Sequence, residues 1–185
     1  MHRRLLRLLP ALILTCLGLA ALTVAHQASA GGKTIRVVPD DGLARQIRQY
    51  RRQTWRWQNV MGVRRTRANR AAVRHPSRTY KRWVRDLWKR RAIRAHRRAH
   101  RPPHKAGWLC IQRHEGAWND PNAPYFGGLQ MDLSFQRAYG AHLLRRKGTA
   151  DHWTPLEQMW VGEKAHRSGR GFYPWPNTAR YCGLI

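Results

Sequence analysis

Acidic residues are scarce in this chain. Its 185 residues include nine Asp and Glu against 36 Lys and Arg, so the formal net charge is +27. His96, His100 and His104 are spaced four apart and could suggest a metal site. Arginines surround them, however, no acid lies close in the sequence, and Pro102 interrupts the helix before the third histidine. We therefore expect neither a metal nor a cofactor.

Long apolar runs are equally rare, and the one present lies near the N-terminus. Residues 8–24 are mostly apolar, follow an Arg-rich start and precede an Ala-Ser-Ala sequence at 28–30. This order is typical of a secretory signal peptide over residues 1–30, and the run is short for an uncleaved membrane anchor. The sequence predicts a secreted protein, extracellular or cell-wall associated, with a flexible tail over 31–42. The export route, Sec or Tat, stays open.

Cysteine occurs at three positions, and removal of the signal peptide leaves Cys110 and Cys182. A lone pair of cysteines in an oxidising compartment usually forms a disulfide. The alternative is a cysteine nucleophile, but neither cysteine has a matching histidine signature beside it. We expect the disulfide.

Charge divides the remaining chain into two regions. Residues 31–105 contain 24 Lys and Arg against three acids, whereas residues 106–185 contain nine against six. Apolar residues at alternating spacings of four and three predict an amphipathic helix over 43–61. Ser77 is a good N-cap for a second helix that runs to about His100, where two prolines follow. We expect an Arg-rich helical hairpin over 43–101 and a Pro-containing linker over 102–107.

The predicted hairpin needs an anionic partner. Outside the cell this would be an anionic wall polymer or lipid headgroups at a membrane surface, bound in a salt-sensitive manner with little specificity. An Arg-rich helix inside a cell would indicate nucleic acid, but no nucleic-acid partner is expected for an exported chain. The alternative is a solvated helical face with no dedicated partner.

The last 80 residues have the composition of a small globular domain. A short helix over 108–115 is predicted to carry Glu115 at its C-terminal end, before a Gly-rich, strand-like run over 125–131. Asp132 or Ser134 can cap a helix that continues to Gly140. A capping box at 154–157 opens another helix. The predicted fold class is α+β, mainly helical.

Several ordered features of this region resemble the catalytic domain of the resuscitation-promoting factors. They are GGLQ at 127–130 downstream of the helix with Cys110 and Glu115, TPLEQ at 154–158, and Trp-Pro at 175–176 ahead of Cys182. Those proteins are transglycosylase-like, lysozyme-fold peptidoglycan enzymes of Gram-positive bacteria. Both cysteines are displaced by four positions from that family's pattern, which is consistent with a bridge that has moved as a unit.

The resemblance covers residues 108–185 and implies a small lysozyme-like domain that acts on peptidoglycan glycan strands. It implies that Glu115 is the catalytic acid. It also implies a sugar-binding cleft at or near Trp118, Tyr125, Gln130 and Gln158.

The reaction depends on whether Glu115 has a second carboxylate as a partner. Asp132 is the best candidate, but a helix cap already explains it. The single-acid route of a lytic transglycosylase is therefore favoured over hydrolysis. Two alternatives remain: a non-catalytic wall-binding protein with a lysozyme-like fold, and a polycationic protein active at surfaces or membranes.

Overall fold

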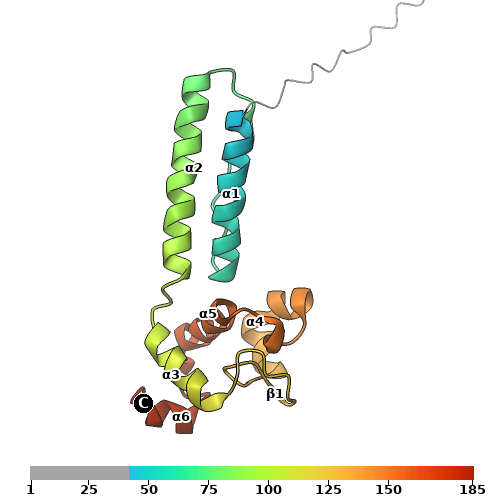
Figure 1. The fold of residues 1–185 in the computed structure, drawn as a ribbon, viewed down its shortest axis with the longest axis vertical. Helices are drawn as coiled ribbons and strands as arrows, with labels where there is room; N and C mark the ends of the chain where they lie inside the picture. The colour runs from blue at the N-terminus through green and yellow to red at the C-terminus, as the bar shows by residue number, and fades with distance from the viewer. Residues whose placement is uncertain (1–41) are drawn as a thin grey trace, which may run out of the picture. The chain divides into compact units, whose positions relative to one another are not determined.

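A computed structural model describes residues 42–185 of the chain, which belong to one compact unit (Figure 1). The predicted signal peptide, residues 1–30, lies outside the described residues, as does the predicted tail up to residue 41. Within residues 42–185, no helix is long and apolar enough to span a membrane. The elements in chain order are α1 (Gly42–Val60), η1 (Ala71–Val73), α2 (Arg78–Ala99), α3 (Lys105–Glu115), β1 (Tyr125–Phe126), β2 (Met131–Asp132), α4 (Leu133–Lys147), η2 (Ala150–His152), α5 (Pro155–Ala165), η3 (His166–Arg170) and α6 (Pro176–Tyr181).

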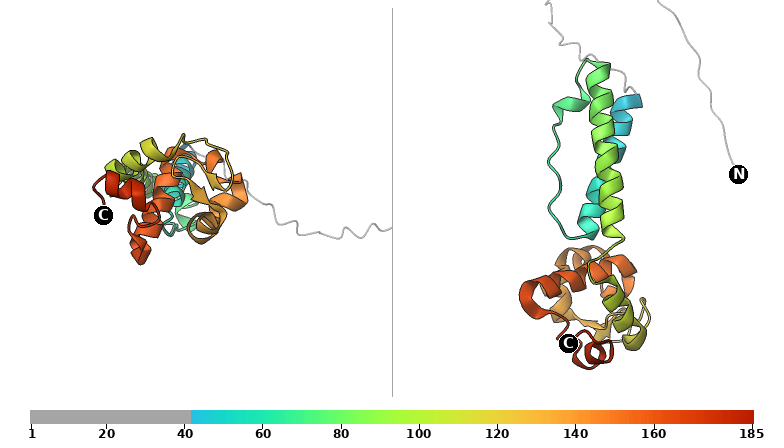
Figure 2. Two further views of the ribbon diagram at one scale, coloured as in Figure 1. Left: turned by 90° about the horizontal axis from the view of Figure 1, so that it is seen from below. Right: turned by 90° about the vertical axis from the view of Figure 1, so that its left-hand side faces the viewer.

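The two helices of the basic region run parallel, which corrects the predicted hairpin. Ile47 of α1 packs with Val84 near the start of α2, and Met61, just after α1, packs with Ala99 at the end of α2. Residues 61–77, here called the return segment, run back along the helices to join them (Figure 2). A helical hairpin uses a connection of about 2–5 residues. The return segment is long enough to retrace α1, which spans roughly 29 Å at 1.5 Å per residue.

The return segment is held against α1 by side chains of the helix that bond Thr66. Trp55 Nε1 donates a hydrogen bond to the Thr66 carbonyl at 2.9 Å, and Gln58 Nε2 donates to Thr66 Oγ1 at 2.7 Å. Ala72 in η1 is buried against Ile47. These contacts stabilise the parallel arrangement, and they are tertiary contacts that helical periodicity does not reveal.

The basic region and the C-terminal region share a small core at the end of α2. Trp160 of α5 is buried with Met61 and Ala99, and its Nε1 donates to the Ala99 carbonyl at 2.8 Å. A buried carboxylate lies beside this core: Glu163 accepts hydrogen bonds from the His104 backbone N–H at 2.7 Å and from Trp108 Nε1 at 2.9 Å. The linker predicted over 102–107 is shorter in the structure, because α3 begins at Lys105.

The C-terminal region is mainly helical, with one two-stranded antiparallel sheet and one disulfide, as predicted. The capping box at the start of α5 is confirmed, with Thr154 and Glu157 bonding each other's backbone N–H groups. Asp132 caps α4, as predicted, but α4 continues to Lys147 with a kink at Gly140. A Cβ at Gly140 would lie 2.5 Å from the Trp153 ring, so glycine there allows the kinked helix to pack on that tryptophan.

Candidate active site

Glu115 lies at the C-terminal end of α3, where the sequence predicts it, and is half-buried. The hydroxyl of Thr178 in α6 donates a hydrogen bond to Glu115 Oε1. Thr178 was not among the predicted site residues. Its position one helical turn before a cysteine was the only sequence signal that could have indicated it.

The disulfide brings α6 to α3. Cys110 and Cys182 are bonded, as predicted, with their Cα atoms 6.0 Å apart. The backbone N–H of Cys182 donates to the Thr178 carbonyl at 2.9 Å, so the cysteine and the threonine lie on consecutive turns. The cross-link to the helix of Glu115 therefore also places Thr178.

Gln130 lies immediately beside the residue that follows Glu115. A Cβ at Gly116 would lie 2.8 Å from Gln130 Nε2, so a side chain there would have to displace the Gln130 amide. Gln130 itself has φ +46°, in the left-handed region that non-glycine residues rarely adopt. Its Nε2 donates to Asp120 Oδ2 at 2.8 Å and to the Gly127 carbonyl at 3.1 Å. Backbone strain of this kind tends to gather at ligand-binding and catalytic sites.

The double glycine shapes the turn between β1 and β2. A Cβ at Gly127, whose φ is +72°, would lie 2.6 Å from Gln158 Oε1, and a Cβ at Gly128 would lie 2.9 Å from the Trp118 ring. Both positions therefore require glycine, because side chains from other segments occupy the space a Cβ would fill.

A groove of about 210 Å³ lies next to this turn. It brings together three of the predicted site residues, Tyr125, Gln130 and Asp132, and Tyr125 is 51% exposed. Arg170 and Trp175 also line the groove and were not predicted to do so. Glu115 lies outside its lining.

The other two predicted sugar-binding residues are placed differently. Gln158 is fully buried, and its Nε2 donates to the Trp118 carbonyl at 2.7 Å and to the Ala150 carbonyl at 2.8 Å. In this structure it supports the loop that carries Trp118 and has no surface available to a ligand. Trp118 is half-buried against the core and against Gly128.

Five of the six acids of residues 106–185 are engaged in interactions that organise the fold. Asp132 accepts from the Phe135 backbone N–H at 2.7 Å and from Ser134 Oγ at 2.7 Å. These two bonds, the backbone one foremost, hold the pKa of the Asp132 carboxyl below its usual range, so it is poorly suited to donate a proton. The partners of the other four are Gln130 and Asn122 for Asp120, His152 for Asp151, Lys147 and Thr154 for Glu157, and His104 and Trp108 for Glu163.

Glu115 differs from four of those acids in the number of residues that its carboxyl contacts. Among the described residues it accepts from one, the Thr178 hydroxyl of α6, whereas each of the four accepts from two: Asp120, Asp132, Glu157 and Glu163. That bond orders the carboxyl. Its second oxygen has no hydrogen-bond partner among residues 42–185, and the side chain is half-buried, so Glu115 can contact a ligand.

Metal-ligand side chains come together at one place in the described chain. Cys110, His114 and Cys182 have ligand atoms within 4.8 Å of one another. Both cysteine sulfurs are joined in the disulfide, so neither is a free thiolate of the kind that binds metal. His96 and His100 instead lie against the Trp57 ring, with ring centroids 4.9 and 4.8 Å from it.

Comparison with protein-family models, curated proteins and solved structures finds no match to this chain.

Proposed function

We propose that this protein is a secreted enzyme that cuts the β-1,4 bond between N-acetylmuramic acid and N-acetylglucosamine in peptidoglycan, with Glu115 as the acid and base. The observation that carries the proposal is that the Glu115 carboxyl, at the end of α3, is held by one hydroxyl, whereas four of the other five acids of its region each accept hydrogen bonds from two residues. The ordered features that resemble the resuscitation-promoting factors supply the substrate class and a lysozyme-like fold. The neighbouring groove, with Tyr125 and Gln130, is the proposed site for a sugar.

The single-acid route fits the distribution of carboxylates. Glu115 donates its proton to the glycosidic oxygen, which leaves as the 4-hydroxyl of N-acetylglucosamine while the bond to C1 of N-acetylmuramic acid breaks. The resulting carboxylate takes the proton of the 6-hydroxyl of the same muramic acid, whose O6 bonds to C1. This gives a 1,6-anhydro product, restores protonated Glu115 and uses no water. A hydrolase of the two-carboxylate kind would need a partner for Glu115, and Asp132 is occupied as a helix cap.

We also propose that the basic region anchors the enzyme to anionic polymers of the wall. Residues 31–105 carry a large excess of Lys and Arg, and such charge gives salt-sensitive binding. Anchoring and cleavage would then be separate activities of one chain.

A dye-release assay on purified peptidoglycan tests the enzymatic proposal. Glu115→Gln keeps the size of the side chain and its ability to accept from Thr178, but it cannot donate and retrieve a proton. We expect release to fall at least about 100-fold, the scale of general acid–base catalysis. Asp86→Asn, a change at an acid of α2, is the matched control and is expected to leave release unchanged.

Mass spectrometry of the products separates the two reactions, because anhydro ends are lighter than reducing ends by one water. Equal and substantial release by wild type and Glu115→Gln would contradict the role of Glu115. No release above background by either protein would contradict the enzymatic proposal and favour a non-catalytic wall-binding protein.

A further inference from the structure

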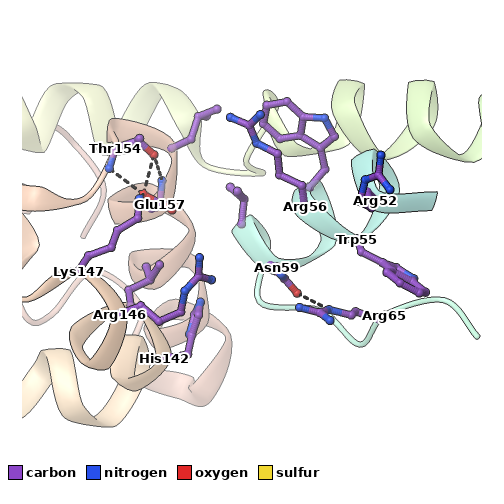
Figure 3. A pocket seen from close by; sticks show the side chains of 14 residues that line it. Arg52, Trp55, Arg56, Asn59, Arg65, His142, Arg146, Lys147, Thr154 and Glu157 are labelled. Carbon is purple, nitrogen blue, oxygen red and sulfur yellow. Dashed lines mark hydrogen bonds and ion pairs between the residues drawn. The ribbon is translucent and has the colours of Figure 1, made fainter. Parts of the chain in front are cut away.

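A second and more strongly charged groove lies between α1 and the α4–α5 part of the C-terminal region. It has a volume of about 550 Å³, within the range of ligand sites. Figure 3 shows Arg52, Arg56 and Arg65 on one side, and Arg146 and Lys147 on the other. None of the residues that line it belongs to the Glu115 site.

Most of the positive charge in this groove is not neutralised. Glu157 is the acid in its lining, and both of its oxygens accept from Lys147 Nζ, at 2.8 and 2.6 Å. Among the residues that the structure describes, Arg52, Arg56 and Arg146 form no ion pair with a carboxylate, and Arg65 bonds the neutral Asn59 side chain. These guanidinium groups are available to an external anion.

The return segment extends the charged surface. A neighbouring cavity of about 440 Å³ is also lined by Trp55 and Arg65. Its other lining residues include Arg51, Arg67 and Arg70. Because the Trp55 indole bonds the backbone of Thr66, the arginines on either side of that threonine are held along α1. The two cavities therefore adjoin at Trp55 and Arg65, and together they are called the basic track.

Arg51 shows that the charges in the track are crowded. Its Nε is buried without a hydrogen-bond partner. Burial, together with repulsion from Arg48, Arg70 and Arg52, holds the pKa of Arg51 below its usual range. An anion bound here would offset that repulsion and could supply the missing acceptor.

The track is suited to bare anionic groups and not to stacked rings. The guanidinium groups of Arg51 and Arg65 already lie over the Trp55 ring, 5.1 and 5.8 Å from its centroid. This leaves less of the indole for a nucleobase, which binds single strands largely by stacking on aromatic side chains. Arginine forks match phosphate oxygens in pairs, and the track is lined by many arginines and a single lysine.

We propose that this track is a binding site for one linear phosphate-bearing polymer, held by Arg52, Arg56 and Arg65 on the α1 side and by Arg146 from α4. The proposal builds on the proposed anchoring role of the basic region and gives it a location and a ligand class. It does not depend on the chemistry of Glu115.

Fluorescence anisotropy with an end-labelled linear polyphosphate tests the site in the full mature chain. The test variant carries Arg52→Gln, Arg56→Gln and Arg146→Gln, three changes at exposed side chains. The control carries Arg82→Gln, Arg90→Gln and Arg94→Gln at exposed positions of α2, so both variants lose the same net charge. We expect the test variant to bind at least about 30-fold more weakly and the slope of log K against log salt to fall by about 2 units, whereas the control changes affinity less than about threefold.

Each other outcome overturns a stated part of the proposal. Equal weakening of both variants would show that the polymer is attracted by the overall charge of the basic region. This would contradict binding in the track but not the anchoring role. No weakening of either would overturn both the groove and the anchoring role, whatever the dye-release assay gives. Equal or tighter binding of polyglutamate or of vesicles containing anionic lipid would overturn the ligand class. Tighter binding of single-stranded DNA than of polyphosphate would overturn the conclusion that the track does not take stacked bases. Glu115→Gln is expected to bind polyphosphate as the wild type does.

Discussion

Thr178 donates the hydrogen bond that Glu115 accepts, although 63 residues separate them in the chain. A disulfide joins α3, which carries Glu115, to Cys182 at the end of α6, which carries Thr178. The Glu115 carboxyl is therefore connected, through Thr178 and α6, to the disulfide of the C-terminal region.

The threonine hydroxyl is predicted to order the acid. Thr178→Val keeps the shape of the side chain but removes the donor, so the Glu115 carboxyl loses its fixed orientation. We expect kcat for glycan cleavage to fall about tenfold with little change in KM, because removing one hydrogen bond to a reacting group costs about 1.5 kcal/mol. Thr178→Ser should restore kcat, and failure of this rescue would indicate that the threonine acts through packing alone.

Loss of the disulfide is predicted to affect both stability and activity. The two cysteines are 72 residues apart, and the chain-entropy model gives such a loop about 4 kcal/mol of stabilisation. We expect Cys110→Ser combined with Cys182→Ser to lower the free energy of unfolding in urea by roughly that amount. Activity should fall further than the unfolded fraction explains, because α6 is no longer held to α3; a strictly proportional fall would argue against the positioning role.

The first glycine of the turn is predicted to be intolerant of any side chain. In Gly127→Ala the new Cβ has both an unfavourable φ and a clash with Gln158. Gly183→Ala is the matched control, since its φ is +64° but nothing lies within 4 Å of its Cβ. We expect the control to cost about 1 kcal/mol, from backbone strain, and Gly127→Ala to cost a further 1–3 kcal/mol or so, from overpacking. Thermal unfolding of both variants tests this, and equal losses would show that the clash relaxes freely.

Low pH is predicted to weaken the ion pair between Lys147 of α4 and Glu157 of α5. Burial opposes ionisation of Glu157, but hydrogen bonds from Lys147 and Thr154 outweigh it and hold the pKa of this carboxyl below its usual range. A carboxyl whose pKa is depressed by folding stabilises the protein above its unfolded pKa, and this contribution disappears as the pH falls through the folded pKa. Urea unfolding should therefore show stability falling below about pH 4.5, the ordinary value for glutamate. Glu157→Gln should flatten this dependence, and an unchanged pH profile would show that other groups dominate it.

Local patterns in the sequence predicted the elements well. Ser77 caps α2, Asp132 caps α4 and Thr154 opens α5 with its capping box, because each of these signals acts through backbone groups a few residues away. Pairing of the two cysteines also followed from composition, since residues 31–185 contain no other cysteine. The predicted direction of α2 relative to α1 was wrong. The spacing of apolar residues shows which face of a helix is buried, but it does not show the path of the chain between two helices.

The candidate site was only partly predictable for the same reason. Glu115, Tyr125 and Gln130 could be placed from motifs, but Gln158 is buried, and the pattern that marks it does not distinguish a ligand contact from a buried support. The basic track was beyond prediction, because its arginines come from α1, the return segment and α4.

The sequence by itself determined the two charge regions, the helix caps, the cross-link and the acid at the end of α3. Each of these depends on composition or on interactions across a few residues. Only the tertiary structure decided the parallel course of α1 and α2, the partnership of Thr178 with Glu115, and the meeting of arginines from three segments. Those features arise from contacts between residues far apart in the chain, and such contacts form only when the hydrophobic cores bring their elements together.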